Sequence, residues 1–273
     1  MQTRGFNGRW IIAIVMALVS LVGYYSSTSV NNVTGEKQRV SGITHEQEIA
    51  LGLQAAPQMA RQFGGISDNA QARNLVARVG KTIIAQSDAA KTPYKYDFHL
   101  LNDDQTVNAF ALPGGQIFIT EALLKRFKTE GQLAGVLAHE IAHVVARHSA
   151  EQMAKQKLTQ GLTGAAAIAA YDPDNPASRN SAQVAAMIGN LVGMKFGRND
   201  ELESDKYGVR FMSQAGYDPR AMLQVMQILA ASSGEKKQSE FLSTHPNPEN
   251  RLAKIQQAIK QQFPQGLPQN LKP

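Results

Sequence analysis

The residues best suited to chemistry are His139, Glu140 and His143, which form an HExxH motif within an apolar run. Positions four apart share one face of an α-helix, so both imidazoles can point at one metal ion. Glu140 follows the first histidine, where its carboxylate can take a proton from water bound to that ion. This pattern is typical of zinc hydrolases, usually peptidases. The alternative is a helix that carries two histidines without a metal.

A third metal ligand is not found close to the motif. The positions at which a metzincin carries a glycine and a third histidine hold Ala146 and Ser149. His148 is expected on a different helix face from the paired histidines, and Glu151 is expected about 12 Å further along the same helix. The remaining ligand must therefore come from elsewhere in the chain.

The next dense acidic group, residues 200–205, opens a predicted helix that runs to Gln214. Glu201 and Asp205 are four apart and share a face, whereas Glu203 points away. We interpret Glu201 as the third ligand of one Zn²⁺ ion and place Asp205 behind it, where it accepts the free ring N–H of a ligand histidine. A solvated acidic helix start has the same pattern, because carboxylates favour helix N-termini.

An HExxH motif followed much later by ExxxD, with Arg198 three residues before Glu201, resembles the gluzincin peptidases that include the HtpX heat-shock protease and the CAAX prenyl endopeptidase. Residues 108–120 fit this resemblance, as do residues 243–246 followed by Arg251. The likeness covers residues 44–258 and is greatest to the small bacterial members of the cell envelope. One departure is Gly197, where the family often has serine, and it concerns helix capping more than the metal.

The resemblance implies an α+β, mostly helical fold: a zincin-like metallopeptidase domain with a small β-sheet and an HExxH active-site helix. It also implies that Arg198 lies with Asp205 behind the metal ligands. In zincins an edge strand above the metal pairs with an extended substrate, a role that falls here to Asn108, Ala109 and Phe110. The alternative for these three residues is a core hairpin with no substrate role.

His245 precedes a predicted helix and lies in a loop. From there it could reach the cleft, where it would either stabilise the oxyanion as a catalytic residue or occupy the open zinc position. A loop histidine that caps local backbone is the alternative.

Composition bounds the remaining possibilities. At 273 residues with 43% hydrophobic content, the chain can hold one sizeable domain or two small ones. The absence of cysteine excludes disulfides, thiolate zinc sites and a lipid-modified N-terminal cysteine. The net charge of +6 is mild, and no basic run interleaves with aromatic residues, so nothing favours nucleic-acid binding.

The N-terminal residues 1–29 predict a membrane anchor or a signal peptide. Arg4 and Arg9 precede an apolar stretch, and no further charge occurs before Glu36. As a helix, residues 10–25 would span about 24 Å, slightly less than the roughly 30 Å hydrocarbon core. No clear Ala-x-Ala cleavage site follows. With either an anchor or a signal peptide, the remaining chain is expected in the periplasm of a bacterial envelope. A retained segment would anchor it in the inner membrane, and a cleaved one would leave it soluble. A buried core helix is the remaining alternative.

The remaining chain divides into a polar linker, a catalytic domain and a flexible tail, at residues 30–43, 44–262 and 263–273. Within the domain, hydrophobic periodicity predicts helices and a strand–turn–strand unit. The helices fall at residues 44–63, 67–84, 129–157, 158–170, 182–196, 200–214, 219–231 and from 248 onwards, and the strands at 96–101, 107–112 and 116–120.

Together these observations predict a zinc metalloendopeptidase with Glu140 as general base. The resemblance and the topology predict that its substrates are misfolded or stalled envelope proteins. A non-catalytic or latent zinc-stabilised module that binds clients is the alternative, with His245 or the loop at 158–181 closing the site.

Overall fold

The computed structural model describes residues 8–40, 42–170, 195–232, 240–246 and 249–273. The elements in chain order are α1 (Gly8–Ser26), β1 (Thr28–Val30), β2 (Lys37–Arg39), α2 (His45–Gln62), α3 (Ala70–Gln86), the 3-10 helix η1 (Asp88–Lys91), β3 (Asp97–Leu101), β4 (Ala109–Leu112), β5 (Gln116–Thr120), α4 (Glu121–Leu124), α5 (Glu130–Val145), α6 (His148–Ala170), α8 (Arg198–Gln214), α9 (Ala221–Ala231), α10 (Glu240–Thr244) and α11 (Arg251–Gln262).

The main sheet has three strands in the order β3-β5-β4. β5 runs parallel to β3 and antiparallel to β4, with Phe118 opposite His99 on one side and Phe110 on the other. Every residue of β5 is buried, as expected for a central strand. β4 is an edge strand of this small sheet, and the mostly helical α+β prediction is confirmed.

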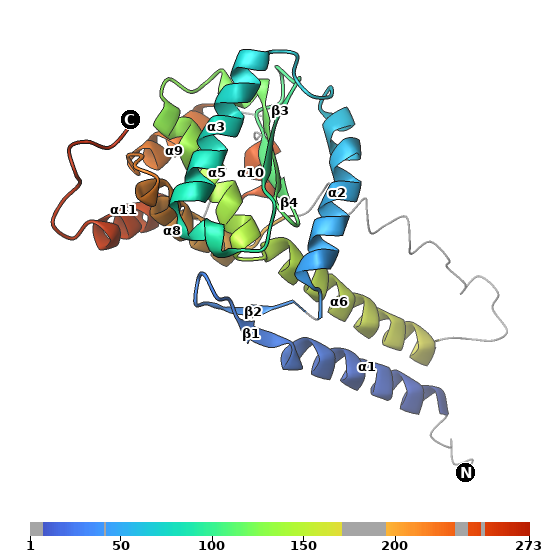
Figure 1. Cartoon of the computed structure of the whole chain (residues 1–273). Coiled ribbons are helices and arrows are strands. Elements are labelled where there is room, and N and C mark those ends of the chain that lie inside the picture. Colours follow the sequence, from blue (N-terminus) through green and yellow to red (C-terminus); the bar gives the residue numbers. More distant parts are fainter. Residues whose placement is uncertain (1–7, 41, 171–194, 233–239, 247–248) are drawn as a thin grey trace, which may run out of the picture.

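The HExxH helix α5 lies at the centre of the molecule (Figure 1). It packs against α3, β4, α8 and α9, and its residues from Gly131 to Val145 are all buried. Helix α2 covers the other face of the sheet, where Met59 packs with Leu112 and Phe118. Because α5 is held on all sides, its side chains have fixed directions.

The predicted single helix at residues 129–157 is wrong, because α5 ends at Val145 and a new helix, α6, begins at His148. Arg147 at the break has a φ of 61°, in the left-handed region that few non-glycine residues adopt. Its buried guanidinium donates to Glu48 Oε2 at 2.8 Å and to the carbonyl of Ile43. These bonds offset the cost of the strained backbone.

Residues 158–170 continue α6 and do not form a separate helix. The helix predicted at residues 182–196 falls almost wholly outside the described residues.

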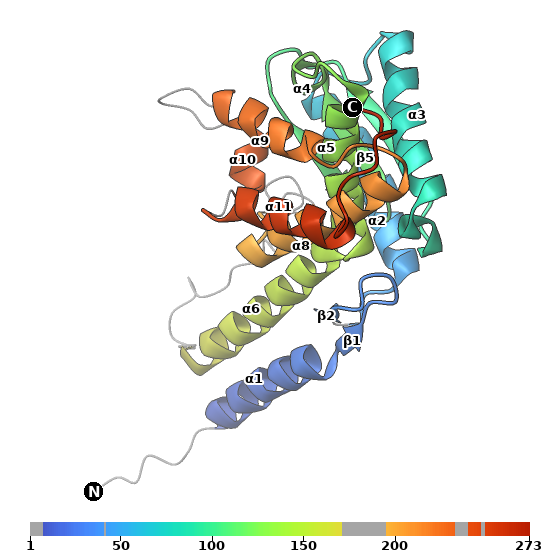
Figure 2. The same ribbon diagram turned by 90° about the vertical axis from the view of Figure 1, so that its left-hand side faces the viewer.

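Helix α1 lies along α6 in both views (Figures 1 and 2). The two helices approach closely, since a Cβ on Gly161 would lie 2.1 Å from Ser20 Oγ. The side of α1 away from Ser20 exposes large apolar side chains, among them Val15, Val19 and Val22. Within the ranges the structure describes, no helix is both apolar and long enough to cross a membrane.

The predicted linker at residues 30–43 is in part an ordered hairpin, since β1 and β2 pair as antiparallel strands. The hairpin docks because its polar groups meet helix ends and side chains of the body. Asn31 Nδ2 donates to the carbonyl of Val145 at 2.7 Å, and Tyr207 Oη donates to the carbonyl of Thr34 at 2.6 Å. This segment therefore contacts the C-terminal end of α5.

The tail predicted to be flexible, residues 263–273, folds back onto the body at its end. Lys272 N donates to the carbonyl of Gly216 at 2.9 Å, and the carbonyl of Pro273 accepts from Gly131 N at 2.8 Å. The first N–H groups of a helix have no partner within it, and Gly131 lies in the first turn of α5. The tail supplies that partner, which composition alone did not indicate.

Candidate metal centre

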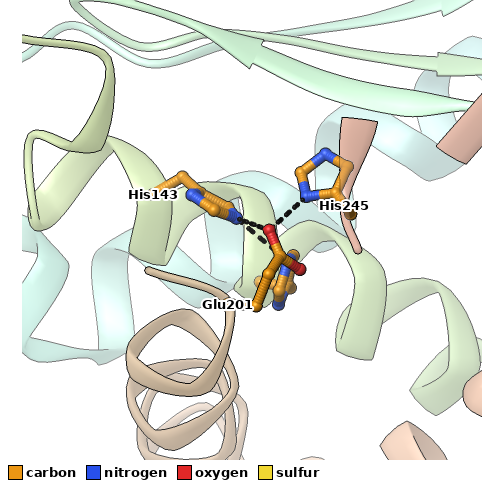
Figure 3. A group of neighbouring side chains, drawn as sticks. His143, Glu201 and His245 are labelled. Atoms are coloured by element: carbon orange, nitrogen blue, oxygen red, sulfur yellow. Dashed lines mark hydrogen bonds and ion pairs between the residues drawn. The ribbon is translucent and has the colours of Figure 1, made fainter. Parts of the chain in front are cut away.

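Four buried side chains from three parts of the chain converge on one position. Figure 3 labels three of them, His143, Glu201 and His245. His139 and His143 come from α5, Glu201 from α8, and His245 from the residue after α10. Each is at most 2% exposed. One nitrogen or oxygen of each lies within 4.8 Å of the others, so the group fits one metal ion.

The distances within the group show how the donors face one another. His139 Nε2 and His143 Nε2 are 3.1 Å apart. The two oxygens of Glu201 lie 3.5 Å and 3.4 Å from these nitrogens. His245 Nδ1 is 3.0 Å from Glu201 Oε1. Imidazole nitrogens and a carboxylate are the donors that a catalytic zinc site uses.

Glu201 reaches α5 because α8 approaches it closely. A Cβ on Gly208 would lie only 3.3 Å from His139 N, so a larger residue there would push the two helices apart. The N-terminus of α8 is also held, since Gly197 N donates to Asp200 Oδ2 at 2.9 Å. Gly197, the position at which this chain departs from the family pattern, is the N-cap, and the side chain of Asp200 makes the capping bond.

Asp205 lies behind His139, where the sequence placed it. Its Oδ1 is 2.9 Å from His139 Nδ1, while its two oxygens also accept from Arg251 Nε and Nη2 at 2.6 Å and 2.9 Å. Arg251 Nη1 lies 3.1 Å from Glu201 Oε2. The buried guanidinium of Arg251 therefore positions two carboxylates. Glu201 is one of the four grouped donors, and Asp205 lies behind His139.

Sequence reasoning gave Arg251 no role and predicted Arg198 for this region. Arg198 is exposed at the first residue of α8, and its predicted role stays a prediction without a buried contact to support it. The resemblance singled out Arg251, after residues 243–246, without assigning it a contact. Two acids on one buried helix face need a cation, but Arg251 is 46 residues from Asp205, and spacing rules do not reach that far.

His148 faces the same site from behind His143, contrary to the expectation that it would lie on another face. The two Nδ1 atoms are 2.9 Å apart, and Ser204 Oγ is 3.3 Å from His148 Nδ1. On the far side of the ring, Glu203 Oε2 is 3.6 Å from His148 Nε2. The helix break at Arg147 turns His148 inward, so it supports a ligand and is not one of the grouped donors.

Glu140 is fully buried beside the grouped donors. Neither of its oxygens has a hydrogen-bond partner in the part of the chain that the structure describes, and Oε1 lies 3.7 Å from His245 Nε2. Burial raises the pKa of this carboxyl. A carboxylate that no neighbouring protein group occupies is free to exchange a proton with a reactant.

The electrostatics of the group favour a bound cation. Burial lowers the pKa of His139, but the carboxylates of Asp205 and Glu201 outweigh it and raise that pKa to about 9. Burial also opposes ionisation of Glu201, yet His245 and the paired histidines hold its pKa well below the usual range. The acids thus draw positive charge into a buried space, and a divalent ion is one source of that charge.

The predicted substrate edge lies at the start of β4. Asn108 immediately precedes the strand and is 3% exposed, while Ala109 and Phe110 are its first two residues. Among the described residues, β4 pairs with a strand on one side only, where β5 lies. A role for these residues in binding substrate stays a prediction.

Comparison with known proteins agrees with this geometry. The model of Peptidase family M48 matches residues 70–259. The chain is 32% identical over 230 residues to a beta-barrel assembly-enhancing protease of Yersinia pestis, covering 80% of this chain and 45% of that protein. The corresponding Escherichia coli protein is 34% identical over 197 residues, covering 68% of this chain and 38% of that protein.

A third relative is the mitochondrial metalloendopeptidase OMA1 of Schizosaccharomyces pombe. It is 33% identical over 254 residues, which cover 91% of this chain and 71% of that protein. The chain thus spans less than half the length of the two bacterial relatives.

Proposed function

This chain belongs to peptidase family M48, and on that premise we propose that it is a zinc-dependent endopeptidase. The observation that carries the proposal is the buried group His139, His143, Glu201 and His245, with Glu140 beside it and its two oxygens without a hydrogen bond from the described residues. His139, His143 and Glu201 would hold the ion. When bound, zinc lowers the pKa of water toward neutrality, which makes hydroxide available.

The chain's own residues would then handle the proton and the charge. Glu140 would accept a proton from the attacking water and deliver it to the leaving amine, because neither of its oxygens is engaged in a hydrogen bond with the described residues. Asp205 would hold the ring of His139 through Nδ1, with Arg251 fixing Asp205 in turn. The edge of β4 would align the peptide backbone of the substrate.

The test combines metal content with activity. Glu140→Gln should retain one zinc ion per chain and lose most cleavage of denatured casein, because a general base contributes roughly 10²–10⁴ to rate. Glu201→Ala should lose the metal itself. Wild-type cleavage by Glu140→Gln would contradict the assigned role.

A latent resting state is the second candidate, and the position of His245 favours it. His245 lies among the donors, with Nδ1 3.0 Å from Glu201, where it would compete with water for the open position. His245→Ala should then raise basal proteolysis. If His245 instead stabilises the oxyanion, the same change should lower it.

The relatives' names support the proposed setting of this activity. Because two relatives are named beta-barrel assembly-enhancing proteases, we propose that this chain acts in the bacterial envelope. Its proposed substrates are envelope proteins that have stalled in assembly. The exposed apolar side of α1 supports membrane attachment through residues 1–29. Alkaline extraction of membranes, with N-terminal sequencing of the mature protein, distinguishes a retained anchor from a cleaved signal peptide.

A further inference from the structure

Helices α1 and α6 extend side by side away from the rest of the molecule (Figures 1 and 2). They run antiparallel, because α1 ends next to the body at Ser26 and α6 begins there at His148. Ser20 on α1 lies against Gly161 on α6, so small residues form part of the seam between them. Small residues at such a seam let two helices approach closely, as they do in helix pairs that are surrounded by lipid.

The sides of α1 that do not face α6 are apolar along most of the helix. Ile11, Leu18 and Val22 are each more than half exposed, and Val19 is 65% exposed. Within the described residues, no other part of the chain covers these side chains. A contiguous apolar surface of this kind marks a site of contact with a partner or with lipid.

The hydroxyl groups of the two helices are already satisfied within their own helix. Ser20 Oγ donates to the carbonyl of Met16 at 2.8 Å. Thr159 and Thr163 on α6 donate to the carbonyls of Lys155 and Thr159 at 3.0 Å and 2.9 Å. Lipid offers no hydrogen bonds, and a polar group without a partner there is costly. These hydroxyls can therefore enter lipid, whereas a polar protein surface would gain nothing from them.

Exposed cations lie where the two helices meet the body. We call them the cationic collar, and they are Lys37 and Arg39 on β2 and Lys155 and Lys157 on α6. Because the helices are antiparallel, Lys157, one turn before Gly161, lies at the level of Tyr24, one turn after Ser20. The exposed amide of Gln160 is less than one turn beyond Lys157. The helices are thus polar at this level and apolar beyond it.

Strand β2 holds its own cation at the same level. The guanidinium of Arg39 lies over the rings of Tyr24 and Tyr25, 5.8 Å and 5.5 Å from their centroids. The backbone N–H of Arg39 donates to Glu151 Oε1 at 2.5 Å, and Glu151 is one turn before Lys155 on α6. Aromatic rings and cations that share one level are typical of a membrane–water interface.

The nearby acids leave the collar with a net positive charge. Glu36 pairs with Lys206 at 3.0 Å, and Glu151 is engaged by the backbone of Arg39. Among the described residues, none of the four collar cations forms an ion pair with an acidic side chain. No acid occurs in the sequence from residue 152 to residue 171. An anionic surface would therefore be attracted to this end of the helix pair.

We propose that the cationic collar binds the headgroups of anionic phospholipids, while α1 and the part of α6 beyond Lys157 lie together in the acyl layer. The proposal rests on the membrane attachment proposed above for residues 1–29, and it adds the second helix and the class of lipid. The lipid phosphates would accept hydrogen bonds from the collar as the apolar sides of α1 leave water.

The first experiment measures the preference for anionic lipid. The full chain with residues 1–29 and Glu140→Gln, which prevents self-cleavage, is divided at equilibrium between two kinds of vesicle. One is phosphatidylcholine, and the other carries about a third phosphatidylglycerol. Each collar cation contributes roughly a fivefold preference, so we expect at least about 100-fold in favour of the anionic vesicles at low salt. Salt near 1 M, with a Debye length of about 3 Å, should remove most of it. Equal distribution at low salt would overturn the proposal.

A pair of double substitutions separates the collar from the overall charge. Lys155→Gln with Lys157→Gln should lower the preference about 25-fold. Arg126→Gln with Lys128→Gln is the matched control, because these exposed cations precede α5 at its far end from α6 and the change in net charge is the same. Zinc content and far-UV circular dichroism check that both variants fold. An equal loss in the two variants would show that net charge sets the preference, and it would refute the collar.

Fluorescence tests whether both helices enter the lipid. Trp10 is the single tryptophan and lies on α1, so brominated acyl chains should quench its emission. The chain has no cysteine, and Thr163→Cys therefore places one environment-sensitive label on α6. Its emission should rise on anionic vesicles, whereas a label at Gln86→Cys, exposed on α3, should not respond.

The outcomes distinguish the parts of the proposal. Quenching of Trp10 without a response at Thr163→Cys would refute the paired insertion and leave the attachment through α1. Absence of quenching, together with a dimer in light scattering, would assign the apolar sides of α1 to a second copy of the chain and overturn the lipid proposal. Because every measurement uses Glu140→Gln, none of these results depends on whether the wild type cleaves casein.

Discussion

Replacing Arg251 with methionine removes the guanidinium that holds Asp205 and Glu201 in the interior. Arg251 is 2% exposed and forms a two-pronged contact with Asp205, so methionine keeps much of its apolar volume and loses both bonds. Asp205 and Glu201 would then remain buried without this counter-charge. Removing one partner of a buried ion pair typically costs about 3–5 kcal/mol.

For a chain of this size that cost corresponds to a fall in Tm of roughly 6–20 °C, measured by differential scanning calorimetry on the metal-free protein. Arg220→Met is the matched control. Arg220 makes a similar two-pronged contact with Asp218, but its side chain is 62% exposed, and exposed pairs contribute less than about 1 kcal/mol.

The zinc dependence of Tm tests whether Arg251 compensates these two acids. A bound divalent ion would replace the missing positive charge beside Glu201, so zinc should raise the Tm of Arg251→Met more than that of the wild type. An unchanged Tm in the metal-free variant, or an equal zinc-dependent rise in both proteins, would show that Arg251 does not compensate these acids.

Three further changes test other parts of the structure. His148→Ala should weaken zinc binding roughly 10–100-fold in a chelator competition while leaving the far-UV circular dichroism unchanged, because it removes the ring behind His143. Arg147→Met should lower the free energy of unfolding by about 3 kcal/mol in urea titrations, since it leaves Glu48 buried without its cationic partner. Lys91 and Gln214 hold the pKa of Asp88 near 2. Asp88→Asn should therefore lower Tm at pH 6, and the difference from wild type should shrink as the pH falls from about 4 to 2.

The elements that sequence periodicity could predict are those whose pattern is local. The HExxH spacing placed two imidazoles on one face of α5, and the Glu201–Asp205 spacing placed both acids toward that helix. Thr44, the first residue of the helix predicted at residues 44–63, caps α2 in a capping box with Gln47. In each case the residues that form the pattern lie within one or two helical turns of each other.

The predictions that were wrong share one physical cause, which is contact between distant parts of the chain. The break at Arg147 depends on Glu48 and Ile43, which are 99 and 104 residues away. Without those bonds we would expect the helix that begins at Glu130 to continue past Val145, as the sequence pattern predicts. The inward position of His148 follows from that break, and so no local rule could have found it.

With the proposed attachment through residues 1–29, the pairing of α1 with α6 would set the height of the four grouped donors above the lipid surface. Lys155 and Lys157 are exposed and are the last charged residues of α6, so a bilayer could receive the paired helices only beyond them. From His148 to Lys157 the helix rises about 14 Å. A substrate embedded in the same membrane would have to extend roughly four or five residues from the headgroups before its chain could be cut.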